Sequence, residues 1–414
     1  MIYDIAIIGN GIIGLSTALS LSESQEKLNI IVIGPKLRTG AATPAAAAML
    51  NSFAEIDYSS FKSKFSKEYF DLSRKATAVW PEFEKKILEY SSSFFDDSIN
   101  LPQLKKSKSY GTYVINNTSV DELDDWNYDA IRSALVEYNH PFNDVDPVTI
   151  QGYKPSPKNR AMRSLFIEGE GWLNPKLVLR NIETALEKKF NVQFADVSAI
   201  KFVLNDKKVT SVKCSDEREI SAGKFLLANG FDFSTLLQRS GMSLPQWVYS
   251  GVGASVEVRT KHSDQKVCIR TPNRGGACGI YVVPFQNPSA EKDFAHFVIG
   301  ASNFVSKDPK FFPRSISIAH LLESGTKEIN ENFFDAEMVG FNIGNRPTTF
   351  DQYPLIGNMG DFKNLFVATG TKRDGFHLAP VVAEALREMM VGSQIMDNSF
   401  ALFHPDREPI RDLS

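Results

Sequence analysis

Cysteine is scarce in this chain. Only three of its 414 residues are cysteines, Cys214, Cys268 and Cys278, and their spacing fits neither a disulfide framework nor a zinc site. The six histidines also lack the spacing of metal ligands. These absences argue against a small disulfide-stabilised secreted protein and against a bound metal, and they predict a reducing compartment.

Long apolar runs and an excess of one charge are also missing. No stretch approaches the roughly 20 apolar residues of a membrane span. The first apolar run, IAIIGNGIIGL, has neither a basic leader nor a small-residue cleavage site, so we expect no signal peptide. The net charge of −3 argues against binding to nucleic acid or to an anionic membrane. The sequence therefore predicts a cytoplasmic protein.

The N-terminus has the pattern of a nucleotide-binding βαβ unit. An apolar strand at Ile5–Ile8, a glycine turn, a helix and a second apolar strand at 28–34 follow one another within about 30 residues. Gly9, Gly11 and Gly14 form the pattern G-x-G-x-x-G. The first glycine permits the tight turn, the second lets the backbone approach a pyrophosphate, and the third lets the helix pack on the strand. This pattern predicts dinucleotide binding at the helix N-terminus.

One expected residue of this motif is absent. The second strand of such units usually ends with an acid that holds the adenosine ribose, and here Gly34 stands at that position. Lys36 and Arg38 follow it, so a site for the 2′-phosphate of NADP is one interpretation. The alternative is that the backbone or another residue holds the ribose.

The middle of the chain alternates between two patterns. Residues 171–190 predict a helix that begins at Asn174-Pro175, and residues 247–304 alternate as antiparallel strands do. An apolar strand at 364–370 and a final helix return to the α/β pattern. The order predicts a nucleotide-binding domain that is interrupted by a substrate domain.

Two arginines stand near the C-terminus in apolar, glycine-rich surroundings. Arg346 lies in GNRPTTFDQYPLIG (344–357), and Arg373 lies in TGTKRDGFHLAP (369–380). Together with TPAAAAMLNSFAE (43–55), these segments resemble the FAD-dependent D-amino acid oxidase family, and within it glycine oxidase and its thiamin-pathway relatives. The resemblance runs through the whole chain in order.

The resemblance implies an α/β fold in which an antiparallel-sheet substrate domain of the α+β type interrupts a Rossmann-like FAD-binding domain. We expect the FAD-binding domain at 1–85, 156–246 and 341–414. We expect the substrate domain at 86–155 and 247–340.

The resemblance also implies which residues contact FAD. The glycine turn would hold the pyrophosphate, the alanine-rich loop would line the isoalloxazine, and the start of the last helix would lie beside the flavin C2=O. The implied cofactor-binding residues are Gly9, Gly11, Ile12, Ile13, Gly14, Ala46, Ala47, Ala48, Met49, Val197, Ala228, Gly230, Gly375, Phe376, His377 and Leu378.

Four residues match active-site positions of the family. Arg346 matches the arginine that pairs with the substrate carboxylate, and arginine suits this task because its planar fork binds a carboxylate through two hydrogen bonds. Arg373 matches a second arginine, and Tyr281 an active-site tyrosine on a strand facing the flavin. His377 is the fourth candidate, and packing is the alternative interpretation of its position.

Two family features are absent. The segment 344–357 contains no cysteine, so we expect FAD to be bound non-covalently. Val298 stands where related enzymes place a lysine near the flavin, so oxygen reactivity is not assured.

The implied reaction is the oxidation of a C–N bond in a small amino acid or secondary amine. Hydride would pass to flavin N5, the imine would hydrolyse, and oxygen or another acceptor would reoxidise the flavin. Two alternatives stay open: a flavin dehydrogenase of 2-hydroxy acids with His377 as base, and a flavin-binding protein whose substrate site has decayed. The sequence leaves the oligomeric state open.

Overall fold

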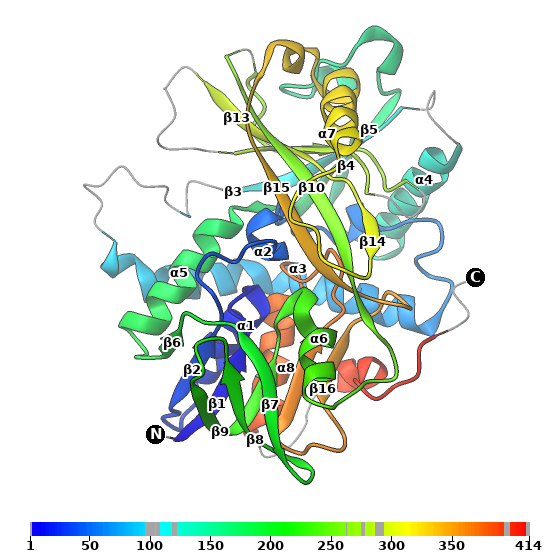
Figure 1. Ribbon diagram of the computed structural model, residues 1–414. Coiled ribbons are helices and arrows are strands. Elements are labelled where there is room, and N and C mark those ends of the chain that lie inside the picture. Colours follow the sequence, from blue (N-terminus) through cyan, green and yellow to red (C-terminus); the bar gives the residue numbers. More distant parts are fainter. Residues whose placement is uncertain are drawn as a thin grey trace.

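The protein is built on two β-sheets, which lie one above the other in Figure 1. The computed structural model describes residues 2–95, 104, 108–117, 122–261, 263–274, 278–285, 294–392 and 398–410. One sheet is rich in parallel strands and the other is mostly antiparallel, which confirms the predicted fold class. None of the helices in these ranges is long and apolar enough to cross a membrane.

The first sheet has the strand order β16-β17-β9-β1-β2-β6. Its inner pairs are parallel, and the hairpin β7-β8 extends it from β9. Its strands are β1 (Ile2–Ile8), β2 (Ile30–Ile33), β6 (Gln193–Ala195), β7 (Ala199–Asn205), β8 (Lys208–Cys214), β9 (Glu219–Leu227), β16 (Leu355–Asn358) and β17 (Leu365–Thr369).

Both faces of this sheet are covered, which explains the unbroken apolar runs of its strands. Ile5 and Ile7 of β1 belong to the core formed with the helices α1 (Ile12–Ser22), α3 (Lys64–Ser91), α5 (Pro175–Lys188) and α8 (Ala379–Val391). Ala6 and Ile8 belong to a second core, formed with the β7-β8 hairpin and α6 (Phe233–Arg239). Alternate side chains of one strand thus fill two different cores.

The second sheet has the order β14-β10-β13-β12-β11-β3-β5-β4. β14 and β13 pair with successive parts of β10, and β15 also pairs with β10, along residues 248–259. Two helices, α4 (Glu122–Glu137) and α7 (Ser315–Ser324), lie with it in the upper part of Figure 1. Its strands are β3 (Lys108–Asn116), β4 (Phe142–Val145), β5 (Arg163–Leu173), β10 (Val248–Thr260), β11 (Cys268–Arg270), β12 (Tyr281–Pro284), β13 (Ala295–Gly300), β14 (Phe304–Ser306) and β15 (Glu337–Thr349).

Two strands of this sheet do not follow the expected domain ranges. β5 lies in the second sheet, although residues 156–246 were expected in the FAD-binding domain. β15 continues across the expected boundary between residues 340 and 341. The reason is pairing: β5 adds to β3, and β15 pairs with β10 over its whole length. The division into two domains by residue range stays a prediction.

A close contact joins the N-terminal α/β segment to the second sheet. The short helix α2 (Ala42–Ala45) packs on β15 at Gly344, where an added Cβ would lie 2.9 Å from the Cβ of Ala45. The amide N–H of Asn345 donates to the carbonyl oxygen of Gly40 at 2.9 Å. The glycine at 344 therefore lets backbone approach backbone where the two sheets meet.

Gly14 tests a second close approach, the packing of α1 against the glycine turn and β1. An added Cβ at Gly14 would lie 1.9 Å from the carbonyl oxygen of Gly9, whereas at Gly11 it would meet Thr43 Oγ1 at 3.4 Å. We expect Gly14→Ala to lower the free energy of unfolding by about 3 kcal/mol, because backbone must move, and Gly11→Ala to change it by less than about 1 kcal/mol. Urea unfolding of the flavin-free chain measures both. Equal effects of the two substitutions would contradict this packing.

Candidate active site

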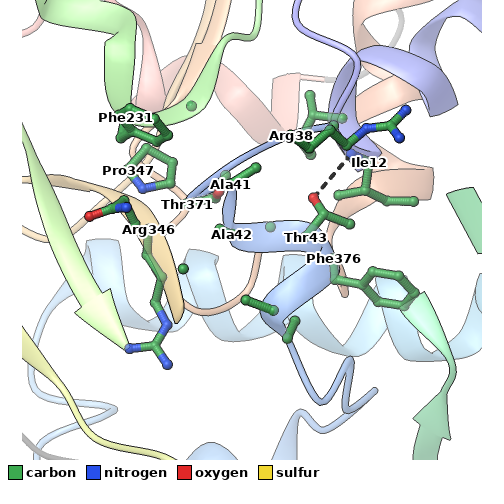
Figure 2. A pocket seen from close by; sticks show the side chains of 18 of the residues that line it. Ile12, Arg38, Ala41, Ala42, Thr43, Phe231, Arg346, Pro347, Thr371 and Phe376 are labelled. Carbon is green, nitrogen blue, oxygen red and sulfur yellow. Dashed lines mark hydrogen bonds between the residues drawn. The ribbon is translucent and has the colours of Figure 1, made fainter. Parts of the chain in front are cut away.

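A cavity of about 570 Å³ lies where the two sheets meet. The glycine turn, the alanine-rich segment, β15 and the start of the C-terminal helix all contribute to its wall. Figure 2 shows the side chains of Ile12, Arg38, Thr43, Arg346 and Phe376 around it. The predicted residues that line it are Gly9, Gly11, Ile12, Ile13, Ala46, Ala47, Ala48, Met49, Ala228, Gly230, Tyr281, Arg346, Arg373, Gly375 and Phe376.

The glycine turn has the geometry that its motif predicts. Gly9 has φ +117°, and a Cβ there would lie 2.2 Å from the carbonyl oxygen of Ala228. Gly11 precedes α1, and a Cβ there meets only Thr43 Oγ1 within 4 Å, which accepts a hydrogen bond from the N–H of Ile12 at 3.2 Å (Figure 2). Gly11, the N-cap residue of α1, has no side chain that could cover the start of the helix. The helix thus presents its positive end to the cavity.

The C-terminal segment is fixed by a buried tryptophan. The indole Nε1 of Trp80 donates to the carbonyl oxygen of His377 at 2.6 Å, and the ring of Trp80 stacks on Phe376 at 5.0 Å between centroids. This places Gly375 and Phe376 in the cavity wall. α8 begins directly after Leu378.

Four predicted residues do not line the cavity: Gly14, Val197, His377 and Leu378. Gly14 packs against the strand, and the neighbours of Val197, Ser198 and Ala199, line the cavity instead. His377 Nε2 lies 2.8 Å from Thr77 Oγ1, and burial lowers the pKa of the imidazole to about 4. A neutral, packed imidazole follows from this environment.

The guanidinium of Arg346 lies over Gly253, which has no side chain to obstruct it. Arg346 lies on β15, and a Cβ at Gly253 of β10 would be 2.1 Å from its Nη2. Its Nη1 donates to the carbonyl oxygen of Ser302 at 3.3 Å and to Asn303 Oδ1 at 3.0 Å, which are both neutral. Among the residues that the structure describes, no carboxylate forms an ion pair with Arg346. Its charge is therefore free to bind an anion in the cavity.

Arg373 differs from Arg346 because it has an internal partner. Its Nη2 lies 3.4 Å from Glu55 Oε2, and the buried Arg270 pairs with the other oxygen of this carboxylate. Burial opposes ionisation of Glu55, but Arg270 and Arg373 outweigh it and lower its pKa to about 2. Asn273 Oδ1 accepts hydrogen bonds from both guanidinium groups, at 2.9 Å from Arg270 and 3.2 Å from Arg373. Two arginines and one carboxylate leave one positive charge in this cluster.

Neither Glu55 nor Arg270 was among the predicted site residues. Both residues line the cavity, but Glu55 is only the last residue of the segment 43–55, and Arg270 stands in a segment with no motif. Glu55 ends the alanine-rich segment, and Arg270 lies 215 positions away on β11. Since only the pairing of distant segments brings the two charges together, one sequence holds no signal for this ion pair.

Tyr281 lies near Arg346 in the wall of the cavity. A Cβ at Gly300 would lie 2.3 Å from the Tyr281 hydroxyl, so the phenol occupies space that this glycine leaves. Burial raises the pKa of Tyr281, against a smaller opposite effect of Arg346, and the phenol is neutral. Within the described ranges the hydroxyl has no hydrogen-bond partner, which leaves it available to a ligand.

Comparisons with known proteins give the family. A family model described as FAD dependent oxidoreductase, DAO, matches residues 4–389. The chain belongs to this family. The resemblance that the sequence motifs indicated is thereby confirmed, and the protein is an FAD-dependent oxidoreductase.

Individual relatives are distant. The bifunctional protein ThiO/ThiG of Trichormus variabilis is 25% identical over 414 residues, which cover 98% of this chain and 55% of that protein. The chain thus spans about half the length of this relative. Glycine oxidase of Pseudomonas aeruginosa is 21% identical over 394 residues, covering 94% of this chain and 95% of that protein. The crystal structure of glycine oxidase from Geobacillus kaustophilus has a TM-score of 0.77 at 18% identity, covering 98% and 99% of the two chains.

The residues around the cavity fit the FAD that the family uses. Gly11 leaves open space in front of the N-terminus of α1, which suits a pyrophosphate. Gly375 and Phe376 lead into α8 at the cavity wall, which suits the negative charge of a reduced flavin. In the described ranges no group of three or more potential ligand side chains could hold a metal ion.

The charge of Glu55 can be tested by measuring how its removal changes the free energy of unfolding. We expect Glu55→Gln to lower the free energy of unfolding by about 2–3 kcal/mol at pH 7, because it leaves Arg270 and Arg373 uncompensated. The pKa of Glu55 in the folded protein is about 2, below its ordinary value of 4.5. The carboxylate therefore contributes its full stabilisation above about pH 4.5, and this stabilisation is lost as the pH falls toward 2. The difference between variant and wild type should therefore shrink as the pH falls through this window.

Glu82→Gln serves as the matched control. Glu82 is exposed and pairs with Lys85 at 3.6 Å, and such a pair contributes less than about 1 kcal/mol. Urea unfolding at pH 7 and at acid pH measures both variants. If the difference in unfolding free energy between Glu55→Gln and wild type is the same at both pH values, the charge of Glu55 is not the cause of the destabilisation.

Proposed function

We propose that this protein oxidises the C–N bond of a small amino acid or secondary amine and that Arg346 binds the substrate carboxylate. The observation that carries the proposal is the guanidinium of Arg346, which lies in the cavity wall with only neutral protein partners. A permanent charge in such a site is stabilised by a ligand of opposite charge. A carboxylate matches its planar fork.

The chain's own residues supply binding and orientation. Arg346 would hold the carboxylate, and the neutral hydroxyl of Tyr281 would donate a hydrogen bond on the same side of the cavity. FAD, held by the glycine turn and by the segment before α8, would supply a two-electron acceptor for the hydride from the α-carbon. The substrate nitrogen gives up a proton, and water then converts the imine to a carbonyl compound and an amine.

Glu55, Arg270 and Arg373 would orient this end of the cavity without binding the carboxylate as strongly. The carboxylate of Glu55 already compensates part of their charge. The glycine oxidases and the ThiO/ThiG proteins among the relatives favour a small amine substrate for this chain.

The alternative of a 2-hydroxy acid dehydrogenase finds less support. That reaction uses a base beside the hydroxyl, and His377 was its candidate. His377 does not line the cavity, and its Nε2 lies against Thr77. The geometry therefore favours amine oxidation, in which positioning does most of the work.

Substitution of Arg346 tests the proposal. We expect Arg346→Ala to raise the KM by at least about 30-fold, because loss of a partner in a desolvated charge pair costs about 2–5 kcal/mol. Arg346→Lys should restore part of the affinity, since an ammonium cannot form the paired contact. Steady-state kinetics with a panel of amino acids and N-methylated amines, at equal flavin content, give these values.

Two controls sharpen this test. Arg373→Ala should raise the KM less, because Glu55 already balances part of the Arg373 charge. A decarboxylated analogue of the substrate should bind wild type and Arg346→Ala equally. If both proteins still discriminate equally between the acid and its analogue, Arg346 does not bind the carboxylate.

Non-covalent binding of FAD is the second part of the proposal. Acid precipitation should release the yellow chromophore into the supernatant, since segment 344–357 has no cysteine. Colour that stays in the pellet would contradict this prediction, and Cys278, which lies in the cavity wall 3.2 Å from Arg373 Nη1, would then be the first thiol to replace.

The glycine turn can be tested by the same absorbance measurement. Gly11→Val should fold but purify without flavin, because a branched side chain would fill the space left for the pyrophosphate. Gly11→Val protein that carries a full complement of FAD would contradict the assignment of this turn.

A further inference from the structure

Gly34 stands where the usual acid of the adenosine site is missing, and the side chain of Asn10 occupies the space beside this glycine. A Cβ at Gly34 would lie 2.7 Å from both Cγ and Oδ1 of Asn10 and 3.1 Å from its backbone nitrogen. Any side chain at position 34 would therefore collide with Asn10. The glycine at the end of β2 and the asparagine in the turn form one coupled pair.

The amide of Asn10 has a defined orientation. Its Nδ2 donates to the carbonyl oxygen of Pro35 at 3.0 Å, which fixes the nitrogen on that side. Oδ1 is left as the acceptor, and in the part of the chain that the structure describes no donor is bound to it. Asn10 is 7% exposed and lines the cavity. A nearly buried acceptor with no protein donor is suited to a ligand hydroxyl.

Arg38 is not free for a ligand phosphate. It forms an ion pair with Glu183, and its Nε donates to the backbone oxygen of Asn10 at 3.0 Å. The guanidinium therefore has a compensating charge and fixes the backbone of the turn. This contact disfavours the interpretation of Arg38 as a reader of the 2′-phosphate of NADP.

We propose that Asn10 replaces the missing acid and that its Oδ1 accepts a hydrogen bond from a ribose hydroxyl of the adenosine in FAD. The acceptor then comes from the glycine turn and is neutral, whereas the usual acid comes from the end of the second strand. The proposal rests on FAD as the cofactor but not on the identity of the substrate. Its test therefore uses binding alone.

The experiment titrates the full-length, flavin-stripped chain with FAD and with an FAD analogue that lacks both hydroxyls of the adenosine ribose. Quenching of flavin fluorescence gives the dissociation constants. For wild type we expect the analogue to bind about 5-fold more weakly, as for the loss of one neutral hydrogen bond. Asn10→Ala should weaken FAD by about the same factor and abolish the difference between FAD and analogue. An unchanged preference for FAD in Asn10→Ala would overturn the proposal.

Position 34 provides a second variant that leaves Asn10 in place. Gly34→Ala should displace the amide and reduce the preference for FAD, whereas Asn10→Ala/Gly34→Ala should be no worse than Asn10→Ala alone. Gly34→Glu alone should impair FAD binding. The double variant Asn10→Ala/Gly34→Glu should again prefer FAD over the analogue, because the space of the Asn10 side chain is then free for the new carboxylate. Independent, additive effects at the two positions would contradict the coupling. Turnover plays no part in these readouts, so failure of the amine-oxidation proposal would leave them interpretable.

Discussion

The antiparallel pairing of β10 with β15 is the contact on which the rest of the site depends. β15 brings Arg346 opposite Gly251 of β10, and the next glycine of that strand, Gly253, leaves room for the guanidinium. Two positions before Arg346, Gly344 lets α2 pack directly on the strand. One strand thus contacts the segment of α2 and also carries Arg346, and a shift of its register by one residue would move Arg346 to the other face of the sheet.

The two C-terminal arginines have different electrostatic surroundings. Arg373 is tied into a cluster in which Glu55 stays ionised between two guanidinium groups. Arg346 meets only neutral oxygens. A partly buried charge with a partner contributes to structure, whereas one with only neutral partners retains its attraction for an anion. The cavity wall therefore holds one arginine whose charge a carboxylate compensates and, among the described residues, a second whose protein partners are neutral.

The same reasoning applies to the adenosine end. Asn10 and Gly34 occupy one volume, so a change at either position alters what the other can do. The ion pair of Arg38 with Glu183 holds this turn from outside. The glycine that departs from the motif at position 34 is thus matched by Asn10, whose side chain fills the space that the glycine leaves.

The sequence by itself determined the family and the βαβ unit with its glycine turn, and most of the site residues that it predicted do line the cavity. These features depend on local spacing, which one sequence displays directly. It also located Arg346, through a segment that resembles the family. Only the tertiary structure decided the membership of β5 in the second sheet, the packing of His377 on Thr77 and the charge cluster of Glu55 with Arg270. Each of these depends on contacts between segments far apart in the chain, and such contacts follow from the complete packing, for which a single sequence has no local pattern.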